Sequence, residues 1–206
     1  MAIFNLYFAS CVLLLTLSWR TSTGHPVPTL SPEQCAHCSL LFRSLLLNVT
    51  QLVDSDVLCF GITSDKVVMK SKADTLEACA PTQTQNSGCM MQRKSSFSES
   101  ECLRNIMKDL AYYDTAIESY LGFPLRSPAE EHSLLRPILG TIKSLKNCSL
   151  MPEGENDSSE KDAAQMWGED TYTNRQEMCK MMRGFHIRAI TINRAMGYIS
   201  SGDHKK

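Results

Sequence analysis

Four stretches of the chain place apolar residues at the three- and four-residue spacing of an amphipathic helix. We expect helices over residues 32–53, 98–121, 133–147 and 172–200. The last of these has the most regular stripe, at Met178, Met182, Phe185, Ala189, Ile192, Met196 and Ile199. Such a stripe is typical of a helix that packs against other helices. No stretch alternates apolar and polar residues convincingly, so the pattern predicts an all-α fold.

Residues at the expected ends support the second helix most clearly. Ser98 followed by Glu101 forms a capping-box pattern, and Gly122 is placed to end the helix. In the third stretch, Pro137 is expected to start or kink the helix, because proline lacks the backbone donor that a helix interior needs.

The lengths of the connections predict the topology. About ten residues separate the second and third helices, whereas more than 40 separate the first two and more than 20 separate the last two. A short connection makes antiparallel neighbours, and a long one lets the chain cross back before the next helix begins. The sequence therefore predicts an up-up-down-down four-helix bundle of the cytokine type, with two long crossover loops.

The N-terminus predicts secretion. An apolar stretch over residues 6–17 is too short to span a bilayer, and small polar residues follow it up to His25. We expect a cleaved signal peptide over 1–24, and a single extracellular bundle domain without membrane insertion over 25–206. Three N-x-S/T sequons fit this route and are candidate glycosylation sites: Asn48, Asn147 and Asn156.

Charge and motifs exclude several classes of function. The 21 Lys and Arg residues against 22 Asp and Glu residues give a formal net charge of −1, so the basic surplus of a nucleic-acid binder is missing. The chain also lacks a nucleophile-elbow motif, a zinc-protease motif and a glycine-rich phosphate loop. We therefore expect neither an enzyme nor a cofactor or metal site.

The cysteines predict disulfide bonds. Of nine cysteines, Cys11 leaves with the signal peptide, and the remaining eight are an even number in an oxidising compartment. In the predicted bundle, Cys59 and Cys179 are the natural pair at one end. The other six are expected at the opposite end, where position alone leaves their pairing open.

A C-x-x-C spacing at Cys35 and Cys38 raises a function of another class, that of a secreted thiol oxidoreductase. A redox motif of this kind lies between a strand and a helix, whereas the surroundings here are helical throughout. A zinc site would need a second pair of ligands at short spacing, and the sequence has none. Two separately bridged cysteines are therefore the favoured interpretation.

The last predicted helix has an unusual back. The side opposite its apolar stripe carries Arg183, Ile187, Ile190, Thr191, Arg194 and Tyr198. Isoleucine, tyrosine and arginine together are typical of a protein-binding hot spot rather than of a solvated face. Incidental exposure of apolar residues remains the alternative, because single exposed apolar side chains are common.

Four segments resemble one protein family. Residues 185–199, residues 76–81, and the blocks 89–97 and 102–110 are similar to the last helix, first crossover and second helix of the interleukin-12 alpha subunit family. This family belongs to the interleukin-6-like long-chain helical cytokines. The resemblance implies a secreted, non-enzymatic subunit that pairs with a soluble receptor-like interleukin-12 beta-type subunit. The heterodimer would bind cell-surface cytokine receptors and signal in immune regulation.

The resemblance also implies a docking site. In the family, the back of the last helix meets the beta subunit, and an arginine corresponding to Arg194 enters a pocket of that subunit. Arg188, Thr191 and Tyr198 match neighbouring interface positions. The alternative within the same fold is a stand-alone interleukin-6-type cytokine that acts without a beta subunit.

Finally, the resemblance implies disulfides between Cys35 and Cys89, Cys59 and Cys179, and Cys79 and Cys102. The family cysteine that joins the mammalian-type chain to its beta subunit is missing here. Cys38 and Cys148 are extra relative to the family, and both are expected at the same end of the bundle. Our hypothesis is therefore a fourth bridge, Cys38–Cys148.

Overall fold

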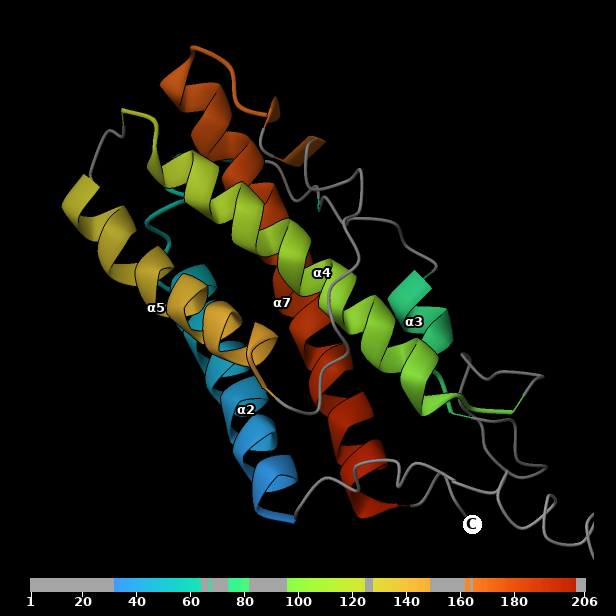
Figure 1. Cartoon of the computed structure of the whole chain (residues 1–206). Helices are drawn as coiled ribbons and strands as arrows, with labels where there is room; N and C mark the ends of the chain where they lie inside the picture. Colours follow the sequence, from blue (N-terminus) through green and yellow to red (C-terminus); the bar gives the residue numbers. More distant parts are fainter. Residues whose placement is uncertain are drawn as a thin grey trace, which may run out of the picture. The chain divides into compact units, whose positions relative to one another are not determined.

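The computed structural model describes residues 32–63, 67, 74–81, 96–124, 128–148, 162–163 and 165–202. Within these residues the regular structure is helical and contains no strand. The bounded helices are α2 (Pro32–Asp54), α3 (Asp74–Ala78), α4 (Glu99–Leu121), α5 (Pro128–Lys146) and α7 (Thr171–Ser201) (Figure 1). The predicted signal peptide over 1–24 lies outside the described residues.

The four long helices form the predicted bundle. In Figure 1, α2 and α4 run in one direction, and α5 and α7 run in the opposite direction. α2 packs against α7 and α5, while α4 packs against α5 and α7, so every packed pair of long helices is antiparallel. The all-α, up-up-down-down architecture predicted from the connection lengths is confirmed.

Side-chain caps account for where two helices begin. The Ser98 hydroxyl accepts a hydrogen bond from the Glu101 backbone N–H at 3.3 Å, which caps α4 as predicted. α7 is capped by Asp170, whose carboxylate accepts the N–H of Tyr172 at 3.2 Å and that of the following residue at 2.9 Å. Gly202 ends α7 with a φ of 70°, a left-handed conformation that glycine adopts without a Cβ clash.

The third long helix begins earlier than predicted. α5 starts at Pro128 rather than at residue 133, and Pro137 lies within it instead of starting it. Proline is well tolerated in the first helical turn, because backbone N–H groups there have no intrahelical acceptor and the missing one costs no hydrogen bond. Pro137 is exposed, so the backbone carbonyl that loses its helical partner lies near water.

The core of the bundle lies between the long helices. The entire apolar stripe predicted for the last helix is buried in α7. At its centre, the rings of Phe185 and Tyr113 stack with their centroids 3.8 Å apart, joining α7 to α4. Full burial of such rings contributes strongly to stability, through both area and packing.

Three disulfides tie the bundle together: Cys59–Cys179, Cys38–Cys148 and Cys79–Cys102. They are the same pairs as three of the four expected from the sequence, including the hypothetical fourth bridge. The first two close loops of 120 and 110 residues at opposite ends of the bundle. Each such loop contributes about 5 kcal/mol in the chain-entropy model. The expected Cys35–Cys89 pair is not tested, because Cys89 lies outside the described residues.

Candidate partner-docking surface

One side of α7 points away from the rest of the bundle. We call it the outer face, and it consists of Arg183, Ile187, Ile190, Thr191, Arg194 and Tyr198. Ile187 is 44% exposed and Arg194 is exposed, while the other four are partly exposed. The structure therefore brings together, on one helix surface, the six residues that helical phase selects.

The outer face combines apolar area with positive charge. Its two isoleucines lie between the two arginines along the helix. Within the described residues, no carboxylate lies within ion-pairing distance of Arg194. The neighbouring Lys180, by contrast, is paired with Glu177 at 2.7 Å. Arg194 is thus the cation that this surface leaves available to an acidic group from outside.

Two outer-face side chains are fixed by local contacts. The Thr191 hydroxyl donates to the backbone carbonyl of Ile187 at 3.2 Å, one turn back in the same helix. The ring of Tyr198 packs edge-on against Phe97, with ring centroids 5.2 Å apart. Phe97 precedes the cap of α4 and was not among the predicted site residues, although it ends one of the resembling blocks. This contact links the outer face to the start of α4.

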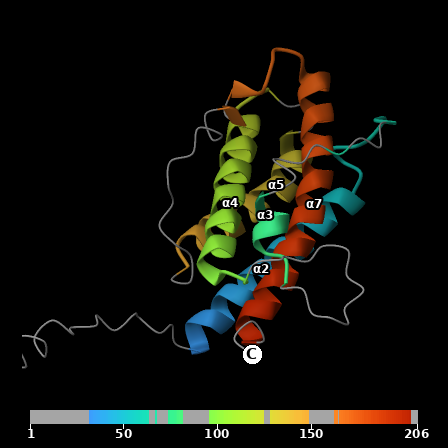
Figure 2. The ribbon, with the colours of Figure 1, turned by 90° about the vertical axis from the view of Figure 1, so that its right-hand side faces the viewer.

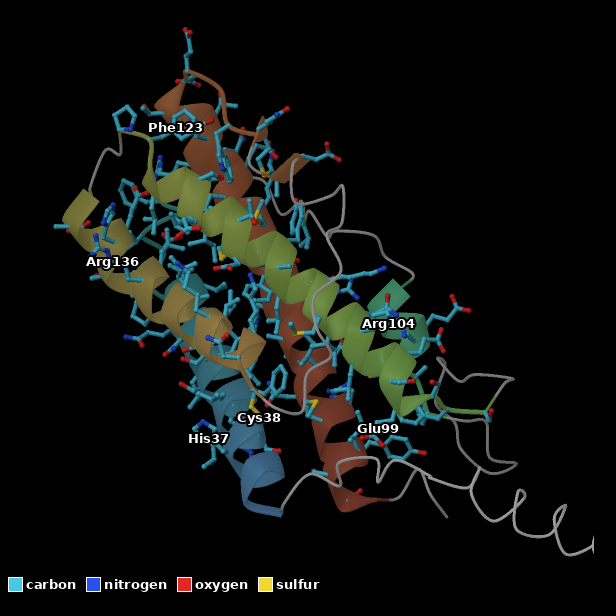
Figure 3. All side chains as sticks on the ribbon, in the orientation of Figure 1. His37, Cys38, Glu99, Arg104, Phe123 and Arg136 are labelled. Atoms are coloured by element: carbon cyan, nitrogen blue, oxygen red, sulfur yellow. A yellow bond between two sulfur atoms is a disulfide. The ribbon has the colours of Figure 1, made fainter. Side chains whose placement is uncertain are left out.

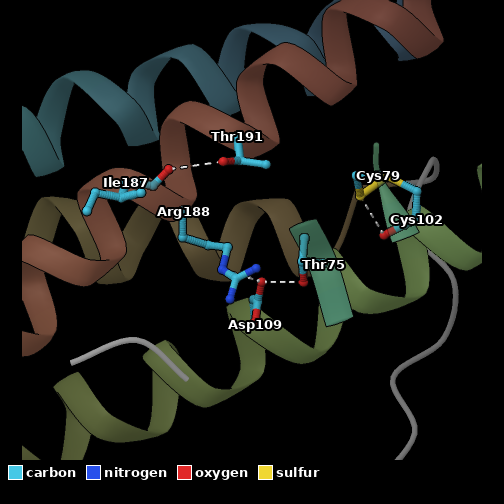
Figure 4. Close-up of polar contacts among 7 residues, drawn as sticks. All are labelled: Thr75, Cys79, Cys102, Asp109, Ile187, Arg188 and Thr191. Carbon is cyan, nitrogen blue, oxygen red and sulfur yellow. Dashed lines mark hydrogen bonds and ion pairs between the residues drawn. A yellow bond between two sulfur atoms is a disulfide. The ribbon is translucent and has the colours of Figure 1, made fainter. Parts of the chain in front are cut away.

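Arg188 is not part of this surface, contrary to its expected place among the docking residues. Its side chain is only 1% exposed, and its Nε lies 3.3 Å from the Asp109 Oδ2 atom of α4. The Thr75 hydroxyl of α3 donates to the same oxygen at 2.6 Å (Figure 4). The physical reason is helical phase, because Arg188 points into the seam between α7 and α4 rather than away from the bundle.

Neither Asp109 nor Thr75 was among the site residues predicted from the sequence. A signal was present, since Asp109 lies within the apolar stripe of α4, directly before the buried Leu110. A carboxylate at a core position needs a charged or hydrogen-bonding partner. The partner could be found only in three dimensions, because it comes from the other end of the chain.

Two tyrosines respond to the buried environment. Burial, followed by repulsion from the Asp109 carboxylate, raises the pKa of Tyr113 far above its usual value. Burial also raises the pKa of Tyr120, whose hydroxyl donates to the Glu131 carboxylate at 2.6 Å. Both phenols are therefore held neutral in the folded protein.

The candidate glycosylation sites have different surroundings. The Asn48 side chain is half-buried on α2, and its Nδ2 donates to the Thr141 hydroxyl of α5 at 3.3 Å. Asn147 is exposed directly after α5, next to the bridged Cys148. Asn156 lies outside the described residues.

The C-x-x-C spacing does not form a dithiol pair. Cys38 is buried and bonded to Cys148, so it is not joined to Cys35. In Figure 3, Cys38 points from α2 toward the bundle, whereas His37 lies on its outer side. Among the described residues, no group of three or more histidine, cysteine or acidic side chains is placed to hold a metal ion. None of the described helices is apolar over a length that would cross a membrane.

Comparisons with known proteins agree on one family. The family model described as "Interleukin-12 alpha subunit" matches residues 4–202. The chain is 28% identical to interleukin-12 subunit alpha of Macaca mulatta over 217 residues, covering 95% of this chain and 96% of the relative. It is 25% identical to the Homo sapiens protein of the same name, with the same coverage. The Felis catus protein is 27% identical over 85% of this chain and 87% of its own length.

Proposed function

The chain belongs to the interleukin-12 alpha subunit family, and from this premise we propose that it is a secreted subunit that pairs with a soluble interleukin-12 beta-type subunit through the outer face of α7. Membership of this family makes the chain a cytokine subunit rather than an enzyme. In the proposal, the heterodimer then binds cell-surface cytokine receptors and signals in immune regulation.

The observation that carries the proposal is the exposed Arg194 on the same side of α7 as the exposed apolar side chain of Ile187. Ile187 remains 44% exposed although the inner side of the same helix is fully packed. An arginine presents a planar fork of donors that matches a carboxylate, and apolar neighbours exclude water from such a pair. We therefore expect the partner to offer an acidic pocket with an apolar rim.

Reversal of the charge at Arg194 tests this proposal. We would co-express the chain with a soluble interleukin-12 beta-type subunit and compare wild type with Arg194→Glu. A matched control is Arg136→Glu, because Arg136 is an exposed arginine on α5, which packs against α2 and α4, away from the outer face (Figure 3). Removing one member of an interfacial charge pair costs about 2–5 kcal/mol, so we expect affinity to fall at least about thirtyfold.

The outcomes separate the two cytokine readings. If wild type and Arg136→Glu capture the beta subunit while Arg194→Glu folds but does not, the heterodimer and its site are supported together. If wild type is secreted alone, captures nothing and still activates cells, the stand-alone interleukin-6-type cytokine replaces the proposal. Equal capture by all three chains would show that the outer face has been misassigned.

A further inference from the structure

The short helix α3 lies over the seam between α4 and α7. Figure 2 shows it in front of the two long helices and between them. α3 packs against α4, and its Thr75 and Ala78 are buried there. The disulfide from Cys79 to Cys102 anchors the residue that follows α3 to the start of α4. α3 is thus attached to α4 both covalently and by packing.

A buried charge cluster joins all three helices at this point. Asp109 of α4 is only 5% exposed. Its carboxylate forms an ion pair with the Arg188 guanidinium of α7 and accepts a hydrogen bond from the Thr75 hydroxyl of α3. A buried ion pair is tolerated only where further hydrogen bonds satisfy its atoms. Thr75 supplies one such bond to Asp109, so this hydrogen bond ties α3 to the charge pair.

The cluster lies directly beside the outer face. Arg188 follows Ile187 in the chain, and at about 100° per residue Thr191 points only about 60° away from Arg188 around the helix. In Figure 4, Ile187 and Thr191 lie on the same stretch of α7 as Arg188, while the Arg188 side chain reaches toward Asp109 and Thr75. Because α3 shares the Asp109 carboxylate with Arg188, we expect it near the Thr191 side of the outer face.

From this arrangement we infer that α3 forms one edge of the docking surface, and that Arg188 is a positioning residue that holds α3 there from inside the bundle. The exposed Glu77 and the half-exposed Leu76 are the side chains that α3 would present at this edge. The inference rests on the proposed function, since the partner is the same beta-type subunit. It differs in assigning a role in binding to a side chain that the partner does not touch.

Thr75→Val is the sharpest test, because it keeps the shape of the side chain and both buried charges but removes the hydrogen bond to Asp109. A matched control is Thr141→Val, which changes a threonine on α5 away from the seam. We would measure the affinity for the beta-type subunit and the hydrogen exchange of the Cys79 and Ala80 amides, which donate to backbone carbonyls of α3. A hydrogen bond to a charged group predicts about tenfold faster exchange of these amides for Thr75→Val, with affinity reduced about three- to tenfold. The control should change neither quantity.

Two further variants separate this inference from the proposed function. Arg194→Ala should weaken binding without altering exchange of these amides, whereas Arg188→Lys should behave as Thr75→Val does. If Arg194→Ala weakens binding but Thr75→Val binds normally despite faster exchange, the role of α3 is overturned and the proposed function stands. If Thr75→Val leaves the exchange unchanged, Arg188 does not act through α3. The same conclusion follows if Arg188→Lys weakens binding and Thr75→Val does not. If no variant affects binding, both proposals fail.

Discussion

The two sides of α7 carry similar types of residue, which are buried on one side and exposed on the other. The inner side carries Phe185 and Arg188, both buried, while the outer face carries Ile187 and Arg194, both exposed. Only six positions separate the two arginines. One is enclosed with a carboxylate, and the other has no acidic partner within the described part of the chain. Residue type therefore does not reveal which arginine meets a partner.

The difference arises from what lies opposite each side. The inner side faces α4, which supplies the ring of Tyr113 and the carboxylate of Asp109. Burying a charge costs free energy of hydration, which contacts such as the ion pair with Asp109 must offset. Arg188 therefore serves the folded structure. On the outer face, the side chains of Ile187 and Arg194 remain exposed, so this part of the surface is available for association.

Among variants on the two sides of α7, we expect the largest loss of folding stability from a substitution in the apolar core. Phe185→Ala would remove a fully buried ring and its stacking on Tyr113, and should lower the free energy of unfolding by about 3–5 kcal/mol. Ile187→Ala, on the outer face, should change it by less than about 1 kcal/mol. Urea denaturation of both variants measures the difference. Similar losses in the two variants would contradict the division of α7 into two sides.

The two arginines offer a second comparison. Arg188→Ala leaves Asp109 buried without its counter-charge, which should cost about 3–5 kcal/mol of folding stability. Arg194→Ala should alter stability by no more than about 0.5 kcal/mol, because an exposed side chain leaves no unpaired group behind. Thermal unfolding of the purified chains provides the measurement. A marked loss of stability in Arg194→Ala would mean that the outer face is structural.

Alkaline pH gives a smaller effect that is specific to the inner side. The folded-state pKa of Tyr113 is raised, so its contribution to stability is complete below the unfolded value near 10 and is lost as pH rises further. The slope is about 1.4 kcal/mol per pH unit for each such tyrosine. Tyr120 adds a similar slope, because its pKa is also raised.

Tyr113→Phe is the matched variant for this pH dependence. The Tyr113 hydroxyl has no hydrogen-bond partner among the described residues, so its removal should cost little at neutral pH. We expect the variant to lose stability above pH 10 with a slope smaller than that of wild type by about 1.4 kcal/mol per pH unit. An unchanged slope in denaturation experiments between pH 9 and 11 would show that Tyr113 is not the source.

Much of the fold was predictable because helix formation and connection length are local properties. The stripe from Met178 to Ile199 and the cap at Ser98 are both found where the sequence predicts them. The start of α5 was predicted at residue 133 instead of Pro128, because the first turn, with Glu130 and Glu131, does not extend the apolar stripe. α3 was missed because five residues are too few to display a helical period.

The sequence by itself determined the four long helices, their connectivity and which side of the last helix is apolar, since a period of 3.6 residues needs no knowledge of distant segments. Only the tertiary structure decided the position of Arg188. That position depends on Asp109 and Thr75, which are distant along the chain and are brought to it by the packing of α4 and α3. A charged side chain can be placed at the seam only when its partner has been placed there as well, because an unpaired charge in the core is too costly to bury.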